Sequence, residues 1–229
     1  MSTVTFSKNT LTILKNFSSL NSNLLVQPGN VIKTITPSKT GMAVATVEET
    51  FDVQFGIWDL NKFLGVVSLF NNPTFTFGDK SVKIKNGSDS VVNYYYSEPR
   101  LLTYPTKDVQ MPSSNVSIVL TEKNFSELQK AASVMQLPDL SFTSDENKIV
   151  GMVSDLSDPT SNSYKIVVSS DYSGPEFLFN FKMENIKILP GDYTINFAKN
   201  VVGEFIHKSI AVKYWYAMEA NTSKYGSDE

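Results

Sequence analysis

The two halves of the chain carry the same helix-start pattern, and this internal repeat restricts the fold more than any other pattern in the sequence. Ser7 and Thr121 each stand where a helix N-cap is expected, and a leucine or phenylalanine follows both of them four and seven residues later. One offset of 114 residues, half of the length of 229, superimposes the two patterns. A two-fold duplication predicts two similar domains. The alternative is a coincidence between two ordinary capped helices.

Most of the remaining sequence has strand character and predicts an α+β fold with antiparallel sheets. Segments rich in β-branched and aromatic residues alternate with turn pairs such as Asn86-Gly87 and Pro190-Gly191. The expected strands are 51–57, 82–84, 164–168, 177–181 and 212–218. The expected helices are Ser7–Phe17, Asp59–Leu69, Thr121–Met135 and a short one at Met183–Leu189.

A proline-containing segment separates the halves. Residues 97–117 include Pro99, Pro105 and Pro112 and show no hydrophobic period, which is typical of an extended connector. We therefore expect an N-terminal domain over 1–110 and a C-terminal domain over 111–229.

Composition argues against most enzyme chemistry. The chain has no cysteine and one histidine, His207, so thiolate zinc sites, cysteine nucleophiles and histidine clusters are excluded. It has no glycine-rich phosphate-binding loop, and the acidic pair Asp145-Glu146 matches no calcium-loop spacing. We expect no catalytic residue, no metal and no cofactor.

Lysines recur on the outer faces of the predicted helices, although the net charge is −3. At about 100° per residue, Lys8 and Lys15 share one line of the first helix, and Lys123 and Lys130 repeat that spacing. Such lines can neutralise phosphates without reading bases, and the alternative is an ordinary solvated helix face. Two further lysines, Lys62 and Lys187, fall within the other predicted helices. A single arginine, Arg100, argues against base-specific readout.

Four segments, in the same order along the chain, resemble the sliding clamps of T-even-type bacteriophages. They are Leu11–Asn21, Phe51–Leu69, Leu189–Tyr193 and Ala217–Ala220. The resemblance implies a homotrimeric ring of two-domain subunits, with helices lining the hole and antiparallel sheet outside. It also implies a non-enzymatic protein that encircles duplex DNA and tethers the replicative DNA polymerase. The implied partners further include a clamp-loader ATPase, and phage late transcription is an additional implied role.

The resemblance also assigns residues to three surfaces. The expected DNA-facing residues are Lys8, Lys15, Lys62, Lys123, Lys130 and Lys187. Subunit junctions are expected at edge strands containing Val92, Tyr94, Tyr96, Tyr164, Ile166 and Val168. A pocket for partner peptides is expected at Leu101, Leu102, Val109, Met111, Tyr216 and Met218. Each set could instead be solvated surface or ordinary core.

Two other function classes stay open. The first is a β-rich structural or adhesive virion protein without a role on DNA, and the second is a sheet-based hydrolase, for which no catalytic pair is found. The chain begins without a basic segment followed by an apolar one, and its densest apolar stretch is far shorter than the roughly 20 residues of a membrane span. We expect no membrane partner, no secretion and a place in the cytoplasm of the infected bacterial host.

Overall fold

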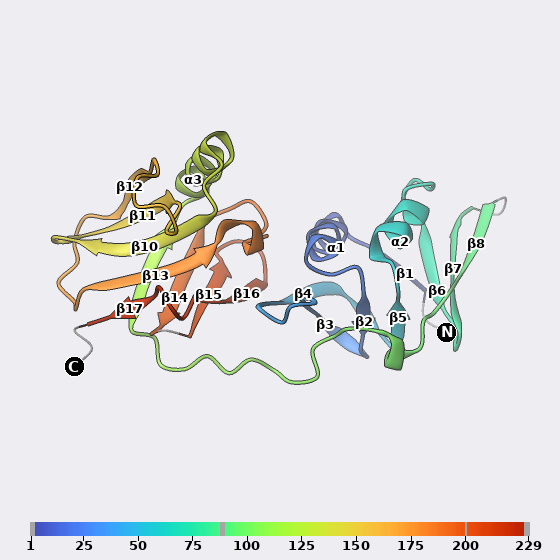
Figure 1. Ribbon diagram of the computed structural model, residues 1–229. Coiled ribbons are helices and arrows are strands. Elements are labelled where there is room, and N and C mark those ends of the chain that lie inside the picture. Colours follow the sequence, from blue (N-terminus) through green and yellow to red (C-terminus); the bar gives the residue numbers. More distant parts are fainter. Residues whose placement is uncertain (1–2, 88–89, 200, 227–229) are drawn as a thin grey trace. The chain divides into compact units, whose positions relative to one another are not determined.

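A computed structural model describes residues 3–87, 90–199 and 201–226. The chain forms two compact units, unit 1 over Met1–Asp108 and unit 2 over Val109–Glu229. The sequence placed the domain boundary between residues 110 and 111. Each unit contains antiparallel sheets with α-helix packed against them (Figure 1).

Unit 1 is built around a four-stranded sheet and two helices. The sheet has the order β1-β6-β7-β8 and consists of Thr3–Thr5, Thr74–Phe77, Ser81–Asn86 and Ser90–Tyr95. The helices α1 (Lys8–Leu20) and α2 (Leu60–Val67) lie side by side (Figure 1). Phe63 of α2 packs edge-on against Tyr94 of β8, with ring centroids 5.1 Å apart, so α2 covers one face of this sheet.

The remaining strands of unit 1 form two further antiparallel pairs. β2 pairs with β5, and β3 pairs with β4. Their bounds are Leu24–Val26, Phe55–Ile57, Gly29–Ile35 and Gly41–Phe51.

Unit 2 repeats this plan. Four hydrogen-bonded strands of one sheet have the order β16-β15-β14-β9 and consist of Val212–Ala217, Val202–His207, Tyr193–Ala198 and Val116–Leu120. The second sheet has the order β12-β11-β10-β13-β17 and consists of Tyr164–Ser169, Lys148–Ser154, Asp139–Asp145, Phe177–Lys182 and Lys224–Tyr225. Helix α3 (Glu122–Met135) packs on β11 and β12.

The strand orders confirm the duplication expected from the sequence. In the sheet of unit 1, β1 precedes α1 in sequence and lies next to the strands β6, β7 and β8, which follow α2. In unit 2, β9 precedes α3 and lies next to β14, β15 and β16 in the same order. Both predicted N-caps are present. The Ser7 hydroxyl accepts the Thr10 backbone N–H at 3.1 Å, and the Thr121 hydroxyl accepts the Asn124 backbone N–H at 3.1 Å.

A buried carboxylate from another strand completes the start of α1. Glu49 of β4 is 8% exposed and accepts the Ser7 backbone N–H and the Thr10 hydroxyl, which is itself fully buried. The carboxylate therefore satisfies donors that the first helical turn leaves without an intrahelical partner. Sequence patterns did not reveal this contact, because Glu49 lies about 40 residues from the helix start.

Two predicted elements differ in the structure. The expected helix Met183–Leu189 is wrong: it is a 3₁₀ turn, η2, over Met183–Asn185. The Tyr216 and Tyr214 hydroxyls accept the backbone N–H groups of Lys187 and Leu189, at 3.2 and 3.3 Å, so these donors are not available to a helix.

The expected continuous strand over 51–57 is broken at residues 52–54, between β4 and β5. The break lets the Phe51 and Phe55 rings meet edge-on at 5.4 Å. Residues four apart in one extended strand would lie about 13 Å apart.

The segment 97–117 is largely free of regular structure, as expected. It contains one 3₁₀ turn, η1, at Pro99–Leu101, and β9 begins within it at Val116.

Candidate nucleic-acid interface and subunit edges

Helix α1 presents its lysines on the side opposite the core. Lys8 and Lys15 are exposed, whereas Ile13, Leu14 and Phe17 are buried. The sequence placed Leu11 on the buried face, but Leu11 is only half-buried, and Ile13 takes its place. The predicted line of two lysines is therefore present on the solvated face of α1.

Helix α2 holds one lysine close to its own N-cap. The Lys62 side chain is 82% exposed, and its Nζ lies 3.4 Å from Asp59 Oδ2. The Lys62 backbone N–H donates to Asp59 Oδ1 at 3.0 Å. This backbone hydrogen bond, followed by the lysine side chain, lowers the pKa of the Asp59 carboxyl. Asp59 therefore offsets part of the positive charge that Lys62 presents.

Helix α3 repeats the arrangement of α1 in unit 2. Lys123 and Lys130 are exposed, while Phe125, Leu128 and Ala132 are buried beneath them. Lys187 was expected on a fourth helix, but it is an exposed residue two positions beyond the end of η2. Five of the six predicted lysines therefore lie on helices, and Lys187 does not.

These lysines can bind phosphates but cannot identify bases on their own. A lysine ammonium is a flexible point charge with three donors, and it neutralises a phosphate without the bidentate geometry that reads guanine.

Both strands predicted to form subunit junctions lie at sheet edges. β8 ends the sheet of unit 1 and pairs with β7, and β12 ends the second sheet of unit 2 and pairs with β11. Within the described residues, neither has a strand partner on its outer side. An edge strand offers a row of backbone donors and acceptors to another chain.

The predicted junction residues lie on the helix-facing side of these strands. Tyr94 packs on Phe63 of α2, and Tyr96 packs on Phe55 at 5.7 Å. The Tyr164 hydroxyl donates to Glu127 of α3 at 3.5 Å. The side chains of Val168 and of Leu128 from α3 both lie next to Gly151, so Val168 is on the face of the sheet that α3 covers. Val92 and Ile166 alternate with them and are half-buried.

The opposite faces of the same strands also expose apolar side chains, which were not predicted from the sequence. Tyr95 is 74% exposed, Val167 51% and Val91 48%. The signal was present, because neighbouring residues of a strand point to opposite faces. Both edge strands therefore expose apolar side chains on the face opposite their helices.

The residues predicted for a partner pocket occupy different environments. Leu102 is buried beside Gly56 in unit 1, and Leu101 is 57% exposed. In unit 2, Tyr216 and Met218 are buried, and the Tyr216 ring packs edge-on against Phe205 at 5.6 Å. Val109 and Met111 are half-buried.

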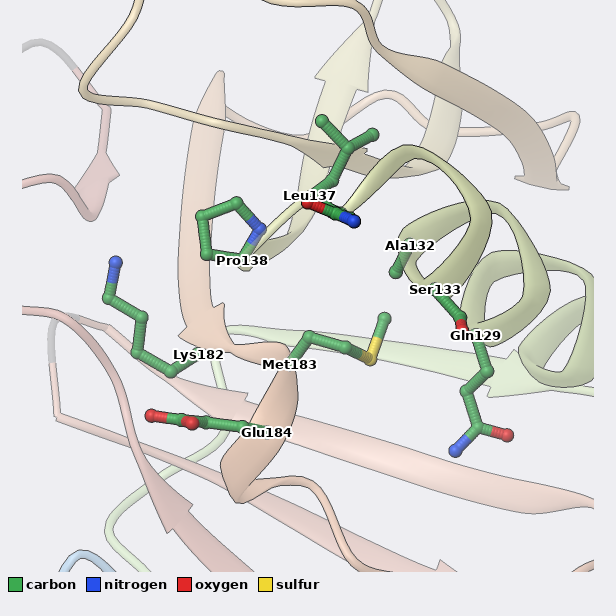
Figure 2. A pocket seen from close by; sticks show the side chains of 9 residues that line it. Gln129, Ala132, Ser133, Leu137, Pro138, Lys182, Met183 and Glu184 are labelled. Atoms are coloured by element: carbon green, nitrogen blue, oxygen red, sulfur yellow. The ribbon is translucent and has the colours of Figure 1, made fainter.

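A cavity of about 610 Å³ lies beside the C-terminal end of α3, next to η2 (Figure 2). Met183 and Ala132 contribute apolar surface to it, and Gln129 and Ser133 contribute polar groups. Lys182 also lines it, but its Nζ lies 2.5 Å from Asp139, which raises the pKa of Lys182.

The single histidine has a structural position. His207 is 7% exposed, its Nε2 donates to the Pro190 carbonyl at 3.0 Å, and its Nδ1 accepts the backbone N–H groups of Ser209 and Ile210 at 3.0 and 3.1 Å. Both ring nitrogens are therefore occupied by backbone. The described part of the chain holds no cluster of three or more potential metal ligands. None of its helices is long and apolar enough to span a membrane.

Comparisons with known proteins agree with this architecture. A family model described as DNA polymerase processivity factor matches residues 7–95. The sliding clamp of Escherichia phage RB69 is 30% identical over 227 residues, covering 95% of this chain and 97% of that protein. The sliding clamp of Enterobacteria phage T4 is 29% identical over 226 residues, covering 95% and 97%.

Solved structures share the fold at much lower identity. The A. fulgidus PCNA with the C-terminal region of FEN-1 bound superimposes with a TM-score of 0.72 at 16% identity, covering 96% of this chain and 98% of that one. A DnaN sliding clamp from Pseudomonas aeruginosa, bound to griselimycin, gives a TM-score of 0.68 at 10% identity, covering 95% of this chain and 65% of the other. The expected α+β fold with two similar clamp domains is thus confirmed. Since a relative that matches over almost its whole length is 30% identical, this chain belongs to the phage sliding-clamp family of DNA polymerase processivity factors.

Proposed function

We propose that this protein is a sliding clamp that encircles duplex DNA and tethers the replicative polymerase during synthesis. The observation that carries the proposal is the repeated two-unit architecture, which leaves β8 in one unit and β12 in the other as unpaired edges. Together with membership of the family, it favours a ring made by joining unlike edges of identical chains. The relatives are sliding clamps, so they give no support to a virion structural protein.

The ring closes as a homotrimer. A contact between two different surfaces of one chain is heterologous, and it forms a closed ring only when the rotation at each contact completes a circle. Three two-unit chains provide six similar domains. The strands containing Val92, Tyr94 and Tyr96 meet those containing Tyr164, Ile166 and Val168 in the next subunit.

DNA lies against the helices rather than the sheets. The lysines that neutralise its phosphates are Lys8, Lys15, Lys62, Lys123, Lys130 and Lys187. Because point charges bind phosphates without regard to sequence, the ring slides along the duplex.

The polymerase and other partners dock at the connector. Leu101, Leu102, Val109, Met111, Tyr216 and Met218 are the residues we assign to partner recognition. A clamp-loader ATPase opens the ring in the host cytoplasm, and late transcription is a further use of the loaded ring. The protein performs no catalysis of its own: its role is to keep the polymerase on DNA.

Native mass tests the assembly. Three copies of the 25.5 kDa chain weigh 76.5 kDa, and light scattering coupled to size exclusion should show this species at micromolar concentration. A monomer at every concentration, together with no stimulation of the cognate polymerase, would refute the proposed ring.

A further inference from the structure

The geometry points to a defined register between β8 of one subunit and β12 of the next. We infer that they pair antiparallel with Asn93 opposite Val167 of the second copy, which places Tyr94 opposite Ile166. The inference rests on the proposed function and adds to it which residues meet.

The helix-facing sides of the two strands limit the possible registers. Tyr94 and Tyr96 face α2 and the aromatic core of unit 1, whereas Tyr164 and Val168 face α3 in unit 2. A sheet that continues across the junction with its helices on one side must place these sets on the same face. A slip of one residue would invert one set, so only slips of two residues compete.

Apolar matching selects among these registers. With Asn93 opposite Val167, the helix-facing pairs are Tyr96–Tyr164, Tyr94–Ile166 and Val92–Val168, and each pair joins two largely apolar side chains. A slip of two residues in either direction leaves one residue of each set without a partner from the other.

The exposed faces agree with the same register. Val167 then lies opposite Asn93 and diagonally between Val91 and Tyr95. Diagonal neighbours across a strand pair are about 7–8 Å apart, which an aromatic side chain can span. All three exposed apolar side chains of the two edges would be covered together.

Charge favours the antiparallel direction. Lys83 and Lys85 on β7 are paired with Asn93 and Val91 and share their exposed face. The start of β12 carries the exposed Lys165, and Asp171 follows its end. With Asn93 opposite Val167, antiparallel pairing places Lys85 level with Ser169, two residues from Asp171, whereas parallel pairing would place Lys85 level with Lys165.

Because the chain has no cysteine, single-cysteine variants test the register directly. V167C would be mixed in turn with N93C, V91C and Y95C, and each mixture would be oxidised with diamide. A disulfide needs Cβ atoms about 3.5–4.5 Å apart, which directly opposed residues approach and diagonal ones do not. All four positions are exposed, so the substitutions should leave the fold intact.

The expected result is a covalent dimer from V167C with N93C, lost or much weaker in the other two mixtures. Each variant oxidised alone should stay monomeric on a denaturing gel, because the contact joins two different strands. A dimer from V91C or Y95C in place of N93C, or from N93C alone, would overturn the register.

Native mass and polymerase stimulation of the same mixtures separate this inference from the proposed function. If a 76.5 kDa species stimulates synthesis and the cross-link appears at another position, the register is wrong and the clamp function stands. If no such species forms, the register and the ring both fail.

Discussion

Removing two helix lysines tests the DNA-facing surface quantitatively. The double variant K15A/K130A takes one exposed lysine from α1 and one from α3. Each side chain lies opposite the buried face of its helix, so its removal should change the free energy of unfolding by no more than about 0.5 kcal/mol. Any loss of DNA affinity would therefore come from lost phosphate contacts.

The size of the effect follows from counterion release. Each lysine that neutralises a phosphate contributes about 0.9 to the slope of log affinity against log salt. Two lost contacts per subunit make that slope shallower by about 1.8 for each subunit engaged. Over a rise from about 50 to 200 mM salt, the wild-type protein should lose roughly 12-fold more affinity than the variant per engaged subunit.

Fluorescence anisotropy of a labelled duplex measures the slope, and light scattering checks that the assembly is unchanged. The control K39A/K199A removes the same charge from exposed positions outside the helices. An unchanged slope in K15A/K130A, or an equal change in the control, would refute the assignment of these lysines to DNA.

Three further perturbations test the structure itself. E49A should lower the free energy of unfolding by about 2–5 kcal/mol, because the Ser7 backbone N–H and the Thr10 hydroxyl lose their acceptor. The control E48A, at an exposed position, should have little effect, and urea denaturation compares the two variants. G191A should lower the free energy of unfolding by more than about 1 kcal/mol in the same assay, because Gly191 has φ +142° and a Cβ there would lie 2.3 Å from His207 Nε2. A G191A protein as stable as the wild type would contradict this expectation. Burial raises the pKa of Tyr96 to about 12, so the stability that the neutral Tyr96 hydroxyl contributes is complete below about pH 10 and is lost as the pH rises through 12. An absorbance titration compared with Y96F should show one tyrosine with a midpoint near pH 12. A midpoint near pH 10 would refute the burial of Tyr96.

Local patterns predicted α1, α2 and α3 because the caps and the apolar spacing that favour these helices lie within the helical segments themselves. Ser7, Asp59 and Thr121 each cap the helix that follows, and the apolar spacing after them identifies the buried face of α3. The duplication was visible for the same reason, since both units begin with a strand, a cap and a helix.

Tertiary contacts decided what the sequence could not. Tyrosine hydroxyls from β16 take the backbone donors of 187 and 189 and prevent the fourth helix, and a carboxylate from β4 completes the start of α1. The edge positions of β8 and β12 depend on strand order, which propensity does not encode. The exposed side chains Val91, Tyr95 and Val167 became informative only once those edges were known.

Retention on circular DNA tests whether the protein holds DNA by encircling it. The labelled clamp would be loaded by its cognate loader onto nicked circular duplex, separated from free protein, and then treated with a restriction enzyme that linearises the DNA. We expect the clamp to stay on the intact circle and to be lost after linearisation, because a ring slides off a free end. Equal retention on circular and linear DNA would show that surface contacts, and not a closed ring around the duplex, hold the protein on DNA.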